Sequence, residues 1–382
     1  MSFDRVSHMT RRRALELMAL GSAGAALPLD AAAQAVSFPR GAIIRTLFRD
    51  MNPADLGGGA TLFHEHLSLP EDFNAKFSAA TAAARAANGL PAATPGGDGR
   101  GRAAGPPPAP AGAARAGGPP ATPAPNPMRD VNLMAEELAT AKREGVACIV
   151  DAGAEAMGRD LDFIRQAATR ADLPVVAAGG FYSQPFYPAA IATMSEEQIV
   201  RALIRQADEA PLGAFGEIGS WDEITKDERK VFRAVGKAHL ETNLPIFTHT
   251  GIPGKSALQQ LDILEDAGVR PERVIIGHLG NLIDANVYVH RAICRRGAFV
   301  GFDRQGGNGD AQQVPMVMAL IEAGFAGNLM FAGDASRGYG RTLTNFLPRL
   351  KAAGATDEVL RGIMVDNPRR FLAFVPKRSR KR

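Results

Sequence analysis

Short runs of apolar residues alternate along the chain with longer segments in which apolar residues recur every three or four positions. The short runs are typical of buried strands and the longer segments of amphipathic helices. Eight strand-like runs are found: ATLFHEHL, ACIVDAG, PVVAAGGF, GAFGEIG, PIFTHTG, RVIIGH, AFVGFD and NLMFAGD. The pattern predicts helices over residues 131–144, 159–169, 195–207, 226–242, 255–267 and 314–323. Ser195 with Gln198 three residues later is typical of a capping box, which supports a helix start there.

The polar or glycine residues that end the eight runs have a regular spacing. Successive intervals are 87, 29, 37, 32, 29, 25 and 31 residues. A strand with its crossover helix needs about 30 residues. The repeat therefore predicts an α/β fold, a (β/α)8 TIM barrel, with an insertion in the first interval.

Residues 78–128 account for the long interval. Of these 51 residues, 38 are Ala, Gly or Pro, and the larger apolar residues are Leu90 and Met128. Such a segment has too little apolar surface to offset the entropy of ordering. We therefore expect a disordered insertion at 78–128 inside a single barrel domain of residues 36–382.

The N-terminal residues are typical of an export signal. Arg11, Arg12 and Arg13 precede an uncharged run of 13 residues, 17–29, and Ala33-Gln34-Ala35 offers a small-x-small cleavage site. The run is shorter than the ~20 apolar residues that span a bilayer. Residues 1–35 are thus expected to be a signal peptide, resembling the twin-arginine type. Such a signal predicts a periplasmic or secreted protein without membrane contact after export. The alternative is that these residues are a basic leader and that the protein stays in the cytoplasm.

The positive net charge of +4 comes from the two ends of the chain and the insertion, and not from the folded domain. The tail at 377–382 contributes +5, the insertion +3 and residues 1–35 a further +1, which leaves about −5 for the rest. A negative body opposes nucleic acid as a partner, and a small-molecule substrate is expected instead. Cys148 and Cys294 have apolar neighbours and are expected to be buried thiols, although a bridge between them stays open.

Ionisable residues gather at the ends of the predicted strands, where the βα loops of a barrel form its active site. His64 and His66 point the same way because side chains alternate along a strand, so the pair can grip one ion. A single histidine is more often structural, but four of the seven histidines lie at three strand ends. The six candidate ligands are His64, His66, Glu217, His249, His278 and Asp334. Imidazole and carboxylate donors favour two divalent ions, most naturally Zn²⁺.

The motifs at these positions resemble the phosphotriesterase family of the amidohydrolase superfamily. They are FHEH at 63–66, GFY at 180–182, GEIGS at 216–220, PIFTHTG at 245–251, IGHLG at 276–280, FDR at 302–304, GDASR at 333–337 and NPRRF at 367–371. The resemblance implies that His64, His66 and Asp334 hold an inner ion and that His249 and His278 hold an outer ion. Many family members bridge the ions with a carboxylated lysine. Here Glu217 occupies that place, as in the phosphotriesterase homology proteins.

The resemblance also implies a mechanism and a substrate class. Two ions ~3.5–4 Å apart would lower the pKa of a bridging water, so that hydroxide attacks a lactone, ester or phosphoester centre. Asp334 would relay the proton, while Tyr182 and Arg304 match positions that line the substrate cleft of lactonase-like members. Lactones or esters are favoured over phosphotriesters. The short loop at residues 335–341 predicts an open cleft.

Two alternatives from other classes remain. A deoxyribonuclease of the TatD type would have a similar set of metal ligands. Phe63 and Ala332-Gly333-Asp334, however, depart from the acidic motifs of that family. A non-catalytic exported binding protein would be expected to lose at least one ligand. The sequence leaves the physiological substrate and the oligomeric state open, and a homodimer is compatible with it.

Overall fold

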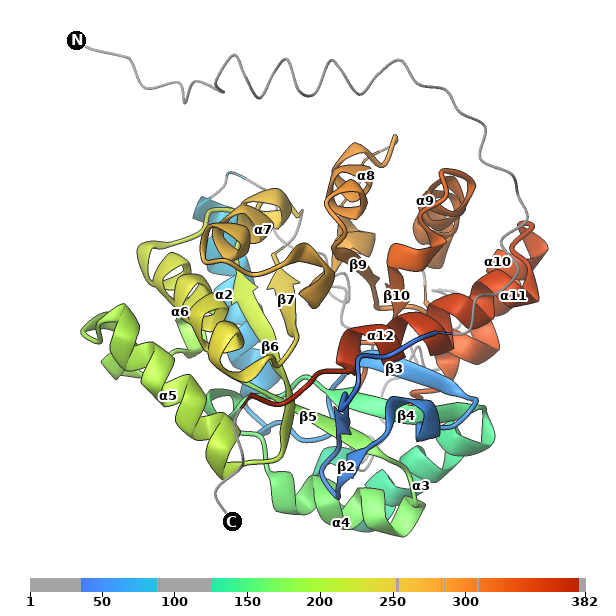
Figure 1. Cartoon of the computed structure of the whole chain (residues 1–382), viewed down its shortest axis with the longest axis horizontal. Coiled ribbons are helices and arrows are strands. Elements are labelled where there is room, and N and C mark those ends of the chain that lie inside the picture. The colour runs from blue at the N-terminus through green and yellow to red at the C-terminus, as the bar shows by residue number, and fades with distance from the viewer. Residues whose placement is uncertain are drawn as a thin grey trace, which may run out of the picture. The chain divides into compact units, whose positions relative to one another are not determined.

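Eight parallel strands form the centre of the fold (Figure 1). The computed structural model describes residues 36–87, 89, 126–251, 254–282, 284, 286–307 and 309–377. The strands are β3 (Ala60–Glu65), β4 (Val146–Asp151), β5 (Val175–Gly179), β6 (Leu212–Ser220), β7 (Ile246–Thr250), β8 (Val274–Ile276), β9 (Phe299–Phe302) and β10 (Leu329–Phe331). Each strand pairs with the next one along the chain, from β3 to β10. All eight predicted strands, and with them the TIM-like barrel, are confirmed.

The barrel closes through the residues that follow β10. The backbone N–H of Asp334 donates to the carbonyl of His64 at 3.0 Å, and the N–H of His66 donates to the carbonyl of Ala335 at 2.9 Å. These two bonds join the end of β3 to the loop after β10. The seam thereby brings three of the predicted ligands to one place.

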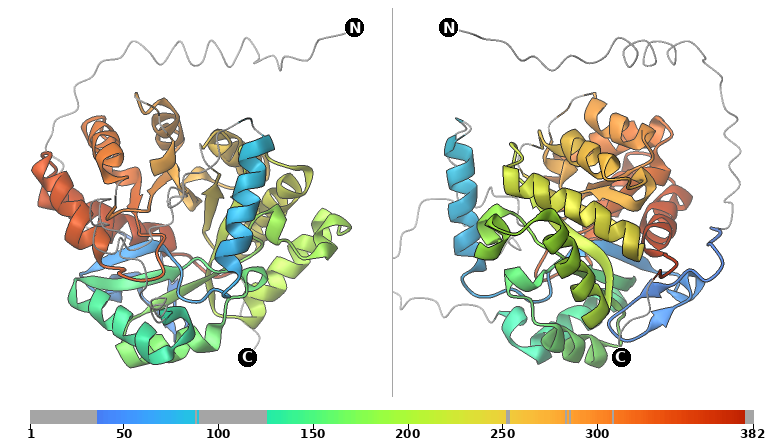
Figure 2. Two further views of the ribbon diagram at one scale, coloured as in Figure 1. Left: turned by 180° about the vertical axis from the view of Figure 1, so that it is seen from behind. Right: turned by 60° about the vertical axis from the view of Figure 1, so that its left-hand side comes forward.

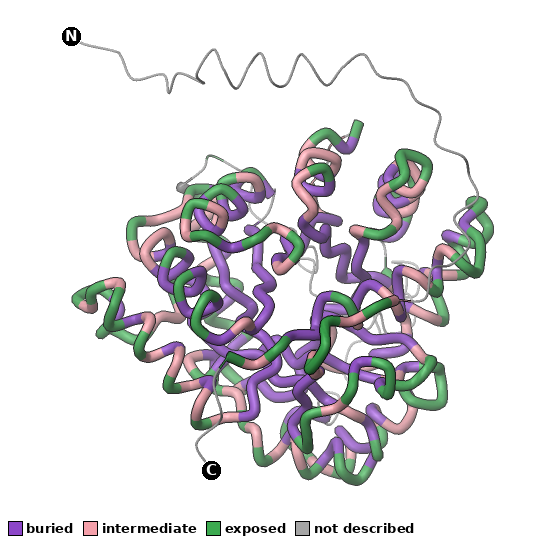
Figure 3. The backbone as a smooth tube through the Cα atoms, in the orientation of Figure 1, coloured by how far each residue is buried: buried purple, intermediate pink, exposed green. Residues whose placement is uncertain are grey.

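Helices cover the outside of the barrel, each with a buried face toward the strands (Figure 3). They are α3 (Val131–Arg143), α4 (Leu161–Ala171), α5 (Glu196–Glu209), α6 (Lys226–Thr242), α7 (Ala257–Asp266), α8 (Tyr288–Arg295), α9 (Asp310–Glu322), α10 (Leu347–Ala352), α11 (Asp357–Arg361) and α12 (Asn367–Leu372). The six predicted helices are all present. The capping box of Ser195 and Gln198 is confirmed, and Thr225 with Glu228 forms a second one.

A two-stranded hairpin at the amino end of the barrel was not predicted. Its strands β1 (Ile44–Arg45) and β2 (Asp50–Met51) are antiparallel. The N–H of Leu47, in the turn between them, donates to the carbonyl of Val175 at the start of β5. Two-residue strands are too short to give an alternating pattern, which is why the sequence does not reveal them.

The insertion starts later than expected. Residues 78–87 belong to α2 (Phe73–Ala87), so the prediction that they lack structure is wrong. Phe73 and Phe77 are buried on one face of α2, and they lie just before the composition-biased segment. Ordering the Ala-rich part is compensated by this anchor, which a composition count beginning at residue 78 leaves out.

Other sequence predictions lie partly or wholly outside the described residues. These include the signal peptide at 1–35, insertion residues 88 and 90–125, and tail residues 378–382. Residues Ser37–Arg382 form one compact unit by their own contacts. Within the described part of the chain, no helix has the length and hydropathy needed to cross a bilayer. Cys148 and Cys294 are both buried and unbridged.

Candidate metal centre

All six predicted ligands lie together at the carboxyl end of the barrel, buried from solvent. His64 is the next-to-last residue of β3, His66 follows the end of that strand, and the seam adds Asp334; we name these three residues the inner group. His249 on β7 and His278 after β8 make up the outer group. Glu217 on β6 lies between the two groups.

Glu217 faces both groups with its two carboxylate oxygens. Oε1 lies 3.5 Å from Nε2 of His66, and Oε2 lies 3.3 Å from Nε2 of His64. Oε2 is also 2.8 Å from Nδ1 of His249 and 3.3 Å from Nε2 of His278. Among the described residues, three sets of three residues have ligand atoms close enough to share an ion, and two of these sets contain Glu217. This is the arrangement that a carboxylate shared between two ions requires.

The residues present fit a metal centre because ring nitrogens of the inner group lie near carboxylates without forming hydrogen bonds to them. Both ring nitrogens of His64 and both of His66 are buried, and none of the four has a hydrogen-bond partner within the described part of the chain. A buried polar atom without a partner is destabilising, and native proteins rarely leave four together. Nitrogen and carboxylate donors around one point are the set that binds Zn²⁺ and similar ions. The buried clusters are therefore consistent with a binuclear metal site.

Asp334 is held from two sides. Nε of Arg304 donates to its Oδ2 at 2.8 Å, while Oδ1 lies 3.1 Å from Nε2 of His66. Burial alone would raise the pKa of Asp334, but the Arg304 guanidinium and the neighbouring histidines hold the pKa well below its usual range. Asp334 is therefore ionised, with one oxygen bound to Arg304 and the other toward the inner histidines.

Glu65 clamps the backbone on either side of Asp334. Its two carboxylate oxygens accept the N–H groups of Gly333 at 2.5 Å and of Ala335 at 2.8 Å. Glu65 sits between His64 and His66 and points to the opposite face of β3, so the strand that supplies the two histidines also fixes the loop of the third ligand. Burial raises the pKa of Glu65 to about 8, against the effect of these hydrogen bonds.

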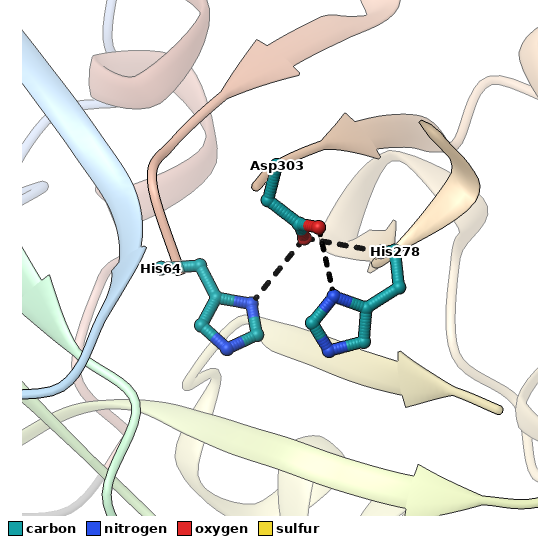
Figure 4. Close-up of side chains that lie close together, drawn as sticks. All are labelled: His64, His278 and Asp303. Carbon is teal, nitrogen blue, oxygen red and sulfur yellow. Dashed lines mark hydrogen bonds and ion pairs between the residues drawn. The ribbon is translucent and has the colours of Figure 1, made fainter. Parts of the chain in front are cut away.

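Asp303, which follows β9, lies between His64 and His278 (Figure 4). Its Oδ1 is 2.8 Å from Nδ1 of His278, and its Oδ2 accepts the backbone N–H of His278 at 3.2 Å. Nδ1 of His64 is farther from it, at 3.7 Å. Both imidazoles thus turn Nδ1 to Asp303 and Nε2 to Glu217. This is how an outer-shell carboxylate orients metal-binding histidines, so Asp303 is better explained as an orienting group than as part of a third ion site.

The protonation of His64 differs from that of His249. Burial lowers the pKa of His64, but the negative charges of Glu217, Asp334 and Asp303 outweigh burial and raise it to about 9. Burial is the main reason that the pKa of His249 is lowered to about 3. The pKa of Glu217 lies well below its usual range because the histidine charges outweigh burial. His249 is therefore neutral and ready to bind a metal, whereas His64 holds a proton that an ion would displace.

Three site residues have left-handed backbone conformations, which bulky residues rarely adopt. The φ angles are 61° at His278, 63° at Arg304 and 47° at Asp334. Each residue directly follows or closely follows a strand end. Backbone strain of this kind is concentrated at functional sites, where the surrounding structure holds it in place.

Tyr182 and Arg304, the two expected substrate residues, both lie beside the centre. Tyr182 is fully buried, and its hydroxyl is 3.1 Å from Nδ1 of His249. Arg304 pairs with Asp334 and also lines a pocket next to His249. Their contact with substrate stays a prediction. What the structure adds is that each of them also contacts a candidate ligand.

Sequence reasoning missed Glu65, Asp303, Phe77 and Trp221. The sequence contained a signal for each of the two acidic residues, because Glu65 separates the two histidines and Asp303 ends a predicted strand. Phe77 and Trp221 come from different segments of the chain, and only folding brings their rings to 6.1 Å.

Comparison with known proteins agrees with this geometry. The model of the phosphotriesterase family matches residues 43–372. The chain is 29% identical over 258 residues to the phosphotriesterase homology protein of Escherichia coli, covering 62% of this chain and 87% of that protein. It is 26% identical over 278 residues to an N-acetyltaurine hydrolase of Dictyostelium discoideum, covering 65% and 75%. It is 29% identical over 265 residues to an aryldialkylphosphatase of Saccharolobus solfataricus, covering 62% and 84%.

A solved structure extends the likeness to the fold. The crystal structure of the Escherichia coli phosphotriesterase homology protein, complexed with phosphate in its active site, superposes with a TM-score of 0.65 at 25% sequence identity. The match covers 82% of this chain and 99% of that one. With the family match over residues 43–372 and the buried ligand clusters, the chain belongs to the phosphotriesterase family and is a metal-dependent hydrolase.

Proposed function

We propose that the protein hydrolyses lactones or carboxylic esters with two zinc ions held by the inner group, the outer group and Glu217. The observation that carries the proposal is the position of Glu217 among four buried histidines, two of which have ring nitrogens without a hydrogen bond in the described part of the chain. Bound divalent ions would lower the pKa of water and polarise the oxygen of a substrate carbonyl.

In this proposal Asp334 is the proton acceptor. Its Oδ2 is engaged by Arg304, so Oδ1 is the atom that takes the proton of the attacking water and passes it to the leaving group. The Arg304 guanidinium keeps Asp334 ionised and in place. Tyr182, through its contact with His249, positions the outer group and borders the substrate.

Hydrolysis of an N-acyl amide is a second candidate. It is supported by several relatives named N-acetyltaurine hydrolase, with identities of 24–26%. Lactones, esters and amides share a carbonyl centre, so one site can serve all three. Phosphotriester hydrolysis, the activity suggested by the aryldialkylphosphatase relative, needs room for three substituents.

A substrate screen combined with metal analysis tests the proposal. The zinc-loaded protein is assayed with lactones, carboxylic esters, N-acetyltaurine, phosphotriesters and single-stranded DNA, and its metal content is measured by elemental analysis. We expect two ions per chain and the highest kcat/KM for a lactone or ester. Preferred cleavage of DNA would support a TatD-type nuclease instead. Fewer than one ion per chain without any turnover would support a non-catalytic binding protein.

We further propose that the protein acts in the periplasm or outside the cell, without membrane contact after export. The support is the arginine-rich leader at residues 1–35. Changing Arg11, Arg12 and Arg13 together to Lys should leave a precursor in the cytoplasm, because a twin-arginine signal is read through its guanidinium groups. Fractionation measures this, and normal export of the triple variant would refute the assignment. Sedimentation of the mature protein tests the proposed homodimer.

A further inference from the structure

One glutamine side chain connects the strands that lead to Glu217, His249 and His278. Gln260 lies on α7, which leads from β7 to β8 and runs beside α6 on the outer side of the barrel (Figure 2). The residue is fully buried. A buried amide normally has a hydrogen-bond partner for each of its polar atoms, so the partners of Gln260 show which parts of the barrel it holds together.

The amide of Gln260 makes four hydrogen bonds. Its Nε2 donates to the backbone carbonyl of His249 at 2.9 Å and to Oγ of Ser220 at 2.8 Å. Its Oε1 accepts the hydroxyl of Thr248 at 2.6 Å and that of Thr250 at 3.2 Å. A carbonyl can only accept, so the bond to His249 fixes which end of the amide is Nε2. Both N–H groups and both lone pairs are in use, and neither a carboxylate nor an apolar side chain could make the same four bonds.

The alternation of side chains along β7 explains how Gln260 reaches its partners. Thr248 and Thr250 flank His249 on this strand. Because neighbouring side chains point to opposite faces, the imidazole points to the metal centre and the two hydroxyls point to α7. Ser220 adds a contact with β6, the strand that carries Glu217. Gln260 therefore holds the backbone behind the imidazole of an outer-group residue.

Gln260 also acts where regular pairing between β7 and β8 stops. The ladder between the two strands ends at the pair of Phe247 and Ile275, before either outer histidine. Beyond it, the N–H of Gly277 donates to Oγ1 of Thr248 at 3.4 Å, and the same hydroxyl donates to Gln260. Only glycine allows this approach, because a Cβ at Gly277 would lie 2.2 Å from the carbonyl oxygen of Thr248. The Gln260–Thr248 pair thus continues the connection up to the residue before His278.

We infer that Gln260 is a positioning residue for the outer ion. Its amide fixes the backbone of β7 at His249 and, through Thr248, the backbone that enters His278. Both outer imidazoles thereby keep the positions from which they can bind one ion. The inference rests on the proposed function in one respect, that an ion binds the outer group.

Gln260→Met tests the role directly. Methionine is unbranched and similar in length, so it fills the space but makes none of the four hydrogen bonds. In competition with a zinc chelator, we expect the more weakly bound ion to lose roughly 10–100-fold in affinity and the tightly bound ion to lose less than about threefold. The visible absorption of the cobalt-loaded protein should change as well, because it reports the arrangement of the ligands. Neither measurement depends on turnover.

Two control variants separate positioning from a general loss of stability. Gln259→Met changes the neighbouring, exposed glutamine of the same helix and should leave metal affinity and the thermal midpoint unchanged. Asn367→Leu removes another buried amide, whose Nδ2 donates to the carbonyls of Ala326 and Leu329 at the start of β10, the end of that strand away from the metal centre. It should lower the thermal midpoint and keep both the metal affinity and the cobalt spectrum. A merely structural Gln260 would behave like Asn367.

Thr248→Val keeps the test decisive if Gln260→Met does not fold. Valine retains the shape of threonine and removes only the hydroxyl that joins Gln260 to Gly277. Affinity for the more weakly bound ion should fall by about threefold, in protein shown to be folded by circular dichroism. A lower thermal midpoint with unchanged metal affinity, in Thr248→Val and in whatever Gln260→Met protein folds, would overturn the inference.

Failure of this inference is distinguishable from failure of the proposed function. If wild type binds two ions and hydrolyses a lactone or ester, but the variants keep their metal affinity, only the positioning role is wrong. If the variants lose the weaker ion as expected and wild type hydrolyses no lactone, ester or amide, the positioning role holds and the hydrolysis proposal is wrong. Fewer than two ions in wild type would overturn both.

Discussion

The inner group is fixed by the backbone of the barrel, whereas the outer group is fixed by side chains. His64 on β3 and His66 directly after that strand point the same way, and the seam hydrogen bonds bring Asp334 beside them. His249 and His278 come from separate strands and depend on Asp303, Tyr182 and aromatic neighbours. The comparison teaches that the inner group is positioned by hydrogen bonds between strands, whereas the outer group is positioned by side-chain packing. We therefore expect the outer half to be the easier one to disturb.

Glu217→Gln should have the largest effect on metal content, because Glu217 is the residue that both groups share. The change replaces a carboxylate by a neutral amide, so two positive ions lose their shared compensating charge. We expect fewer than two ions per chain, with the outer ion lost first, and a fall in turnover above the 10–100-fold that is typical of outer-shell changes. Elemental analysis and kcat measure both effects.

A matched control separates this from a general loss of charge. Glu223→Gln changes an exposed carboxylate six residues further along the chain and should leave metal content and kcat unchanged. Two ions per chain and full activity in the Glu217 variant would show that the shared ligand comes from elsewhere.

Asp334→Asn should separate chemistry from metal binding within the inner group. Asparagine keeps one side-chain oxygen near the inner histidines but cannot accept and relay a proton. Turnover should fall by a factor on the order of 100 to 10,000, while the variant retains more metal than Glu217→Gln does. Near-normal turnover with full metal content would exclude proton transfer through Asp334.

Glu65→Gln tests whether the backbone clamp holds Asp334 in place. Glutamine keeps one acceptor oxygen, but its NH₂ group would face a backbone N–H of Gly333 or Ala335. We expect a loss of roughly 1–3 kcal/mol in the free energy of unfolding and a lower kcat with little change in KM. Glu137→Gln is the matched control, because Glu137 accepts the N–H of Gly338 in the same loop at 2.7 Å. An equal fall in kcat for both variants would mean that the loop as a whole matters and the clamp does not.

Asp303→Asn should weaken the outer ion more than the inner one. Asp303 is 2.8 Å from Nδ1 of His278 but 3.7 Å from Nδ1 of His64. Losing an outer-shell carboxylate typically costs 10–100-fold in metal affinity. We expect that loss for the second ion taken up, measured by competition with a zinc chelator. Equal loss at both ions would remove the distinction between the groups that we draw here.

The same division explains what the sequence could predict. The barrel and the inner histidines follow from local patterns. The eight apolar runs and the two histidines spaced two residues apart can both be recognised in the sequence. The clamp of Glu65 and the orienting role of Asp303 are set by contacts 268 and 25 residues apart. The helical start of the insertion was missed because Phe73 and Phe77 anchor it from outside the biased segment. Contacts between residues far apart in the chain leave no periodic pattern in the sequence from which they could be predicted.

Two tyrosines, one beside each group, allow the inner and outer groups to be compared by the same substitution. The hydroxyl of Tyr182 lies 3.1 Å from Nδ1 of His249 in the outer group. The hydroxyl of Tyr339 donates to the backbone carbonyl of His66 in the inner group at 3.0 Å. Both residues are buried, and replacement by Phe removes a single oxygen from each.

These two variants should have the smallest and most sharply different effects. Tyr182→Phe removes a contact of an outer-group imidazole, so affinity for the second ion should fall by a few fold, which corresponds to roughly 1 kcal/mol. Tyr339→Phe leaves the inner imidazoles untouched and removes the hydrogen bonds of the hydroxyl to the His66 carbonyl and to Sδ of Met134, so the midpoint of thermal unfolding should fall while metal affinity is kept. Chelator competition and thermal unfolding measured on both variants decide the matter. If Tyr339→Phe lost metal and Tyr182→Phe lost only stability, the inner group would depend on its neighbours' side chains and the outer group would not, the reverse of what the contacts indicate.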